Sequence, residues 1–198
     1  MSSEKCLKLQ KQFISKGRLQ NYTNYREYAN NIKLSKDFYI PLSIVEISFR
    51  NSLNHFFMNK IGPNWLSRND ILKLDAQRNI NNATKMIVQQ HKLITNDNLI
   101  AELNFGFWIR LLTKAYSPYL RYNDLKLIFP NLPSSKEKKI NRHFVFTKLN
   151  NIRLFRNKVF HHDKIISKEE YKNMMDEIYK ILGYFDNELI NITKDLNK

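Results

Sequence analysis

The sequence has little of what disulfide or thiolate-metal cross-linking requires. Among its 198 residues only Cys6 is a cysteine. A lone thiol excludes an intrachain disulfide and a zinc site built on thiolates, and it fits a reducing cytoplasm, where we expect the protein to act. The five histidines are scattered, and none begins the H-E-x-x-H pattern of zinc peptidases. We therefore expect neither a metal nor a cofactor.

Long apolar runs and glycine-rich loops are missing as well. The longest apolar stretches, such as residues 38–47, are interrupted or flanked by charged side chains, and none approaches the roughly 20 residues that cross a bilayer. The segment 1–16 carries several charges and lacks the apolar core of a signal peptide. No glycine loop of the kind that cradles nucleotide phosphates is present. We expect no membrane span, no export and no nucleotide hydrolysis.

Few residues interrupt helices. The chain has four glycines and five prolines, and no segment alternates apolar and polar residues as a strand would. These features predict an all-α fold, a helical bundle with additional helices, in one domain covering residues 1–198, with residues 1–35 as an N-terminal arm. We expect helices over residues 37–61 with Pro41 in the first turn, over 75–92 and over 98–116, followed by a rigid connector at 129–133.

Two capping boxes predict the last two helices. Ser134 with Glu137 begins a helix over about residues 134–162, and Ser167 with Glu170 begins another over about 167–195. Along the last helix, apolar residues recur at alternating spacings of four and three, which favours packing against another helix. These residues are Tyr171, Met175, Ile178, Leu182, Phe185, Leu189 and Ile192.

Acidic residues are too few to balance the basic ones. Lysine and arginine outnumber aspartate and glutamate by 33 to 18, a formal charge of +15. Such a charge attracts polyanions, either nucleic acid or an acidic membrane surface, although compositional drift toward lysine also produces basic chains. A dense basic run is most often a solvated helix face, but it is also a candidate RNA contact. The candidate RNA-binding residues are Lys136, Lys138, Lys139, Arg142, His143, Arg153 and Lys158.

Arg156 and His161 form the candidate catalytic pair. On a helix, Arg156 projects near the centre of an apolar stripe, so it must meet a carboxylate, line a wet cleft or face a partner. His161 lies about 140° further round an ideal helix, so the two converge only if the helix ends near Phe160 or a second subunit completes the site. This pair suits RNA transesterification, in which the 2′-hydroxyl attacks phosphorus, histidine moves protons and arginine holds the phosphorane oxygens.

Residues 156–161, R-N-K-V-F-H, resemble the R-x4-6-H motif of HEPN ribonucleases. Together with residues 153–163, 105–108 and 128–133, they make the chain similar to the Abi-like (AbiD/AbiF) abortive-infection family over nearly its whole length. Asp163 stands where that family usually has glutamate. The resemblance implies a HEPN helical bundle, a homodimer with a composite active site, RNA cleavage in phage defence and, in some relatives, control by a small non-coding RNA.

A second match to the motif occurs at residues 50–55, R-N-S-L-N-H, with Glu46 one helical turn before it. It is a coincidence on a solvated face, a supporting polar group facing the catalytic helix, or a second catalytic centre. In the supporting interpretation Glu46, Arg50 and Asn51 orient Arg156 or Asn157. The second histidine of the pair, His162, is a substitute proton carrier or a helix C-terminal cap.

Other functions compete with cleavage. The same arginine and histidine could grip phosphate in a non-catalytic RNA-binding protein. A helical interaction module, with Arg156 locked in a buried ion pair, is another alternative. A DNA-binding regulator has less support, because no helix-turn-helix with a short glycine-containing turn is evident.

Overall fold

The computed structural model describes residues 8, 10–133 and 140–198, and within these ranges the chain forms helices and no strands. The all-α class is confirmed. No helix in the described ranges combines the length and apolar character that crossing a membrane requires.

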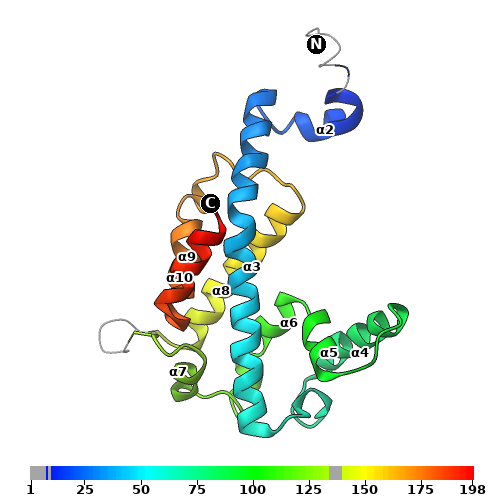
Figure 1. Ribbon diagram of the computed structural model, residues 1–198, viewed down its shortest axis with the longest axis vertical. Coiled ribbons are helices and arrows are strands. Elements are labelled where there is room, and N and C mark those ends of the chain that lie inside the picture. Colours follow the sequence, from blue (N-terminus) through cyan, green and yellow to red (C-terminus); the bar gives the residue numbers. More distant parts are fainter. Residues whose placement is uncertain (1–7, 9, 134–139) are drawn as a thin grey trace.

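The central element is the long helix α3, Tyr25–Ile61, which runs along most of the molecule (Figure 1). Asn24 caps it by accepting a hydrogen bond from the Glu27 backbone N–H, and Gly62 ends it at φ 126°. The predicted start at residue 37 is wrong, and residues 25–35 of the expected arm belong to this helix. Its buried face comprises Asn31, Ser35, Phe38, Pro41, Leu42, Val45, Phe49, Leu53, Phe56 and Phe57.

Pro41 lies in the interior of α3 and not in its first turn. A proline lacks the N–H that would pair with the carbonyl of Asp37, four residues earlier. The side chain of Asn197, near the C-terminus, donates a hydrogen bond of 2.9 Å to that carbonyl. The helix therefore continues through the proline with the carbonyl satisfied from outside.

The middle of the chain forms short helices after α4, Leu74–Gln89. The single helix predicted over residues 98–116 is wrong, because it is divided into α5, Asn96–Glu102, α6, Phe105–Arg110, and a 3-10 turn, Lys114–Tyr116. The side chain of Asn104 accepts a hydrogen bond from the Phe107 N–H and so begins a new helix. After α7, Leu125–Ile128, the connector at 129–133 buries Phe129 and Leu132.

Helix α8, Arg142–Phe160, contains Arg156, and His161 follows directly after its last residue. The predicted capping box of Ser134 and Glu137 lies outside the described residues. Within them, Asn141 caps α8 by accepting a hydrogen bond from the Phe144 N–H.

The predicted last helix over 167–195 is two helices, α9, Met174–Phe185, and α10, Asn187–Leu196. Ser167 has φ 61° and does not act as a cap; only a 3-10 turn, Glu169–Tyr171, forms at the predicted start. Asp186 breaks the helix because its backbone is extended. Its side chain then caps α10 by accepting a hydrogen bond from the Glu188 N–H. Ile178 and Leu182 of the predicted seam are buried, whereas Ile192, beyond the break, is exposed.

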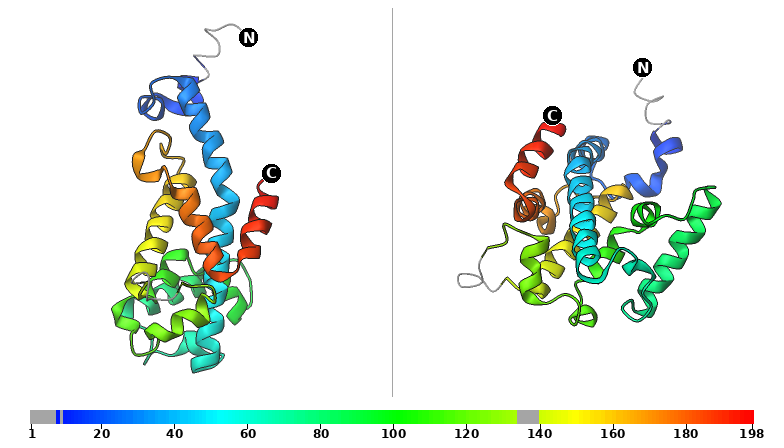
Figure 2. Two further views of the ribbon diagram at one scale, coloured as in Figure 1. Left: turned by 90° about the vertical axis from the view of Figure 1, so that its left-hand side faces the viewer. Right: turned by 60° about the horizontal axis from the view of Figure 1, so that its bottom comes forward.

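Helices α6, α7, α8, α9 and α10 all pack against α3, and Figure 2 shows α10 folding back beside it. Helix α8 runs antiparallel to α3: Glu46 meets Arg156, Tyr39 meets Phe160, and the carbonyl of Asp163 meets Asn31. Because the two helices run in opposite directions, the end of α8 lies beside the early turns of α3.

Candidate functional site

Arg156 lies on the flank of α8 that faces α3. Its Nε atom is 3.3 Å from Oε2 of Glu46, in an ion pair without hydrogen-bond geometry, and about a third of the side chain, 33%, is exposed. The guanidinium lies 4.2 Å from the ring centre of Phe160, and that ring stacks on Tyr39 at 5.4 Å. Of the three environments that the sequence allowed, the structure therefore shows a carboxylate partner, with part of the guanidinium still open to solvent.

His161 is where α8 stops. Its backbone N–H donates to the carbonyl of Asn157 at 2.9 Å, its own backbone (φ −89°, ψ 5°) forms the C-cap, and its side chain is exposed. His162 then takes φ 57° and turns the chain away. The helix ends at the position that convergence of Arg156 and His161 requires. Within the described ranges no hydrogen bond joins the two side chains.

Asn31 of α3 holds the turn that follows these histidines. The residue is fully buried, its Nδ2 donates to the carbonyl of Asp163 at 3.1 Å, and its Oδ1 accepts from the N–H groups of Ile165 and Ile166 at 2.7 and 3.0 Å. One amide thus satisfies three backbone groups of the turn. Buried unpaired backbone groups are costly, so this contact fixes where the chain leaves α8.

The N-terminal segment also contacts this turn. Arg18, in helix α2, Lys16–Leu19, donates through Nη1 to the carbonyl of His162 at 2.6 Å. Lys164 pairs with Glu27 at 2.7 Å and donates to the carbonyl of Asn21 at 3.1 Å. The hydrogen bond from Lys164, followed by that from the Thr23 N–H, lowers the pKa of Glu27 to about 2. The N-terminal segment and α3 together therefore position the end of α8.

A polar cavity of about 660 Å³ lies between the N-terminal segment and this turn. Its basic lining residues outnumber its two acidic ones, Asp163 and Glu170, and Lys158 pairs with Asp163 at 3.1 Å. The basic residues are Arg18, Lys158, Lys164, Lys168 and His162. A polar, net positive cavity of this kind suits a phosphate-bearing ligand.

The other supporting residues are dispersed. Glu46 pairs with Arg156 and not with Arg50, the partner that helix spacing suggested. Arg50 Nε donates to Oδ1 of its neighbour Asn51 at 3.3 Å. In the described part of the chain neither residue has a hydrogen bond to Arg156 or Asn157, and Asn157 is half-buried with no side-chain hydrogen bond. Glu46 alone of this group reaches the candidate pair.

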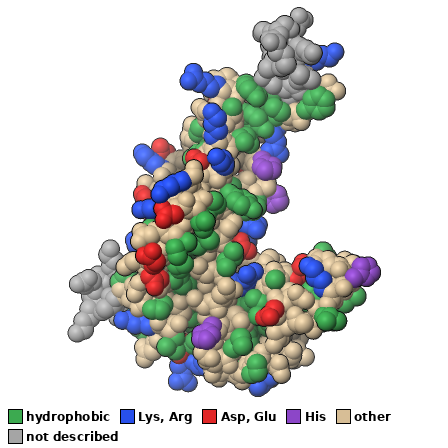
Figure 3. Space-filling view, in the orientation of Figure 1, with side chains coloured by type: hydrophobic (Ala, Val, Ile, Leu, Met, Phe, Trp, Pro, Cys, Tyr) green, Lys and Arg blue, Asp and Glu red, His purple; other side chains and the backbone are tan. Residues whose placement is uncertain are grey.

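The predicted RNA-binding residues that the structure describes lie along α8. Lys136, Lys138 and Lys139 lie outside the described residues. Arg142 and the exposed His143 begin the helix, and Arg142 donates to the carbonyl of Leu120 at 2.9 Å. Further along, both Arg153 Nε and Nη2 donate to Oδ1 of Asn150, and Lys158 lies in the final turn. On the face shown in Figure 3, lysine and arginine side chains are spread out and do not form one patch.

Sequence reasoning missed Asn31 and Phe160. Asn31 continues the buried spacing of α3 at positions 31, 35, 38, 42 and 45, so a polar residue in a core stripe was the available signal. Phe160 lies inside the motif, one turn after Arg156, where an aromatic ring can receive the guanidinium. In the described ranges no three histidine, cysteine, aspartate or glutamate side chains gather as metal ligands would.

Comparison with family models, with curated proteins and with solved structures finds no match to this chain. The similarity to Abi-like HEPN proteins accordingly remains an interpretation of the motif residues, and the geometry of the α8 terminus is what the structure contributes to it.

Proposed function

We propose that the protein is an endoribonuclease whose reacting groups are Arg156 and His161. The observation that carries the proposal is the end of α8. The helix stops directly before His161, leaving an exposed imidazole, while Arg156 stays in the helix with a carboxylate and an aromatic ring beside it. Buried contacts from Asn31 hold the turn in place.

The reaction uses a nucleophile supplied by the substrate. The 2′-hydroxyl oxygen attacks the adjacent phosphorus, its proton passes to a base, and the P–O5′ bond breaks as the leaving oxygen takes up a proton. The products are a 2′,3′-cyclic phosphate and a 5′-hydroxyl. The imidazole of His161 carries one of these protons, and the planar fork of Arg156 stabilises charge on the non-bridging oxygens. No metal ion is needed to generate the nucleophile.

A homodimer is the second part of the proposal. Within the described ranges the Arg156 and His161 side chains of one chain share no hydrogen bond, and in the proposed site each arginine works with the histidine of the other copy. A second copy of the chain would supply that histidine. A groove of about 490 Å³ beside Phe160 and His162 supports such an interface, because exposed apolar side chains line it. They are Ile32, Tyr39 and Leu196.

The role in phage defence, and silencing by a small non-coding RNA, are proposed on the resemblance of residues 105–108, 128–133 and 153–163 to the Abi-like family. The net charge of +15 suits an RNA partner of either kind, substrate or regulator.

The test is cleavage of total RNA in EDTA by wild type, His161→Ala and His55→Ala, with product ends analysed for 2′,3′-cyclic phosphate. We expect wild type and His55→Ala to cut and His161→Ala to lose about 10²- to 10⁴-fold in rate. His55 is a matched control because it also ends an R-N-x-x-x-H sequence and is exposed. If no protein cuts but all bind RNA, the non-catalytic binding function replaces this proposal.

The composite site has its own test. Arg156→Ala and His161→Ala, each inactive alone, are mixed under conditions that let subunits exchange. If each site takes its arginine and histidine from different copies, random pairing restores about a quarter of wild-type activity. A mixture that stays inactive although light scattering shows mixed dimers would contradict the composite site.

A further inference from the structure

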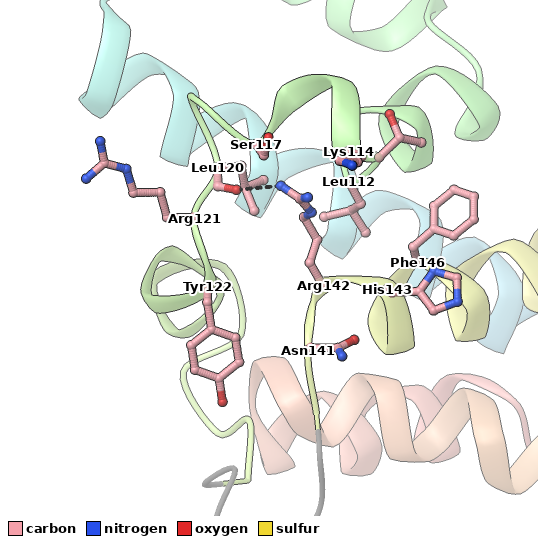
Figure 4. Close-up of a pocket in the computed structure, with 11 residues that line it drawn as sticks. Leu112, Lys114, Ser117, Leu120, Arg121, Tyr122, Asn141, Arg142, His143 and Phe146 are labelled. Atoms are coloured by element: carbon pink, nitrogen blue, oxygen red, sulfur yellow. Dashed lines mark hydrogen bonds between the residues drawn. The ribbon is translucent and has the colours of Figure 1, made fainter.

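The opposite end of α8 carries a second basic cavity, about 640 Å³ in volume and separate from the catalytic pair. It is formed by the start of α8 and by residues 112–122, which follow α6. Figure 4 shows Arg142 pointing toward Leu120, with Lys114 and His143 on one side and Arg121 and Tyr122 on the other. Four of the lining residues are basic, counting the histidine, and none is acidic.

Aromatic and basic groups both line this cavity. The rings of His143 and Phe146 stack on each other with centres 6.4 Å apart, and the side chain of Tyr122 is 47% exposed. Arg142 uses Nη1 for its hydrogen bond to Leu120 at 2.9 Å, which leaves other guanidinium donors for a ligand. Exposed rings among cations are the features by which proteins hold single-stranded nucleic acid, since bases stack on the rings and phosphates meet the charges.

The geometry of α8 connects this cavity with the candidate active site. Arg142 and His161 are separated along the helix axis by about 28 Å, at 1.5 Å per residue. The arginines of α8, at 142, 153 and 156, fall within about 60° of one another around an ideal helix. They lie on one side of α8, with Arg153 between the cavity and Arg156.

We propose that this cavity is a docking site for single-stranded RNA, which holds a part of the substrate several nucleotides from the bond that is cut. The inference rests on the proposed function, because that function makes the strand RNA. It adds a binding determinant outside the catalytic pair. Short RNAs that cannot reach both places lose the contribution of the cavity, whereas longer strands use both.

The experiment measures equilibrium binding of a fluorescein-labelled oligouridylate longer than α8. Every protein carries His161→Ala, so that the strand stays intact. The cavity variant is Lys114→Gln with Arg121→Gln, and the matched control is Arg78→Gln with Lys85→Gln, two exposed cations of α4. We expect the cavity variant to raise Kd about tenfold and to lower the slope of log K against log salt by about 1.4, and the control to do neither.

Tyr122→Ala tests the cavity without changing charge. We expect it to raise Kd about tenfold through lost stacking, while Tyr25→Ala, a tyrosine of similar exposure on α3, leaves Kd unchanged. Circular dichroism melts verify that each variant folds. If the double variant does not fold, the result for Tyr122→Ala decides. Equal Kd values for cavity and control variants, or no RNA binding at all, overturn the inference.

The failure of this inference and that of the proposed function are distinguishable. If RNA is cut through His161 but binding ignores the cavity variants, only the docking site is wrong. If binding depends on the cavity but His161→Ala and its parent both leave RNA uncut, only the catalytic proposal is wrong.

Discussion

The chain contains the pattern R-N-x-x-x-H twice, at residues 50–55 in α3 and at 156–161 at the end of α8, and the two copies have different surroundings. In α3 the helix continues through the pattern: Arg50 contacts its neighbour Asn51, and His55 contacts Asn59 one turn on. In α8 the arginine meets Glu46 from another helix, and the helix stops before the histidine.

The difference shows that the same residue spacing can lie in different local structures. Five residues of unbroken helix separate two side chains by about 140°, so Arg50 and His55 point to different sides of α3. In α8 the helix ends at His161, and Asn31 fixes the direction in which the chain leaves. The helix end, together with contacts from α3, distinguishes the second copy from the first.

The largest expected effect follows from removing each arginine. Arg156→Ala should lower kcat/KM for RNA cleavage by about 10²- to 10³-fold, because a fixed donor for the charge that develops on the phosphorane is lost. Arg50→Ala removes the same charge from the other copy and should leave the rate within about twofold. Single-turnover kinetics measure both. Equal losses would contradict the contrast between the copies and restore a supporting role for Arg50.

The next effect concerns the hold on the turn after α8. Asn31→Ala leaves three backbone groups, one buried and two partly buried, without this partner and should lower the free energy of unfolding by about 2 kcal/mol. Asn30→Ala, at the exposed neighbour, is the control and should change it by less than about 0.5 kcal/mol. Urea unfolding gives both values.

Asn31 as a positioning residue has a kinetic consequence too. At a temperature where Asn31→Ala is fully folded, kcat should fall while the salt dependence of RNA binding stays as in wild type, because the lost contact orients the histidine turn and touches no phosphate. A variant that loses stability but keeps wild-type kcat would limit Asn31 to folding.

The elements were predictable from the sequence where one residue type decides them. Gly62 and Pro63 mark the end of α3, and the scarcity of glycine and proline predicted the helical class. The breaks at Asn104 and Asp186 were missed because each lies inside an apolar pattern that suits a continuous helix, and only a side chain that accepts a backbone N–H reveals the restart. Pro41 was misplaced because its tolerance in α3 depends on Asn197, distant in sequence.

The candidate site was also predictable in part. An arginine on an apolar stripe requires a partner, and this argument led to Arg156. Glu46 entered the supporting residues separately, as the acidic residue one helical turn before Arg50. Which arginine Glu46 would choose depends on the antiparallel register of α3 and α8, which one-dimensional spacing does not contain. Asn31 was missed because residues 1–35 were interpreted as an arm, so its place on a buried face was not considered.

A smaller effect tests directly whether Glu46 pairs with Arg156 or with Arg50. Double-mutant cycles pair Glu46→Ala with Arg156→Ala and, separately, with Arg50→Ala, and compare free energies of unfolding. The first pair should show a coupling of about 0.5–1 kcal/mol, because both side chains are partly exposed, and the second should show about zero. A larger coupling to Arg50 would mean that Glu46 serves the first copy of the pattern in solution.

The smallest expected effect is a pH dependence of the free energy of unfolding. It arises from Glu27, which pairs with Lys164 in the turn after the α8 copy of the pattern. Its pKa lies at about 2, below the ordinary 4.5, chiefly because Lys164 binds its carboxylate. A lowered pKa means that ionised Glu27 stabilises the fold above pH 4.5 and that this contribution is lost as pH falls toward 2. The difference in unfolding free energy between wild type and Glu27→Gln should therefore narrow over that window. When Glu27→Gln is made in a Lys164→Met protein, most of this narrowing should disappear. A wild-type difference that stays constant with pH would show that the Glu27–Lys164 pair does not hold the histidine turn.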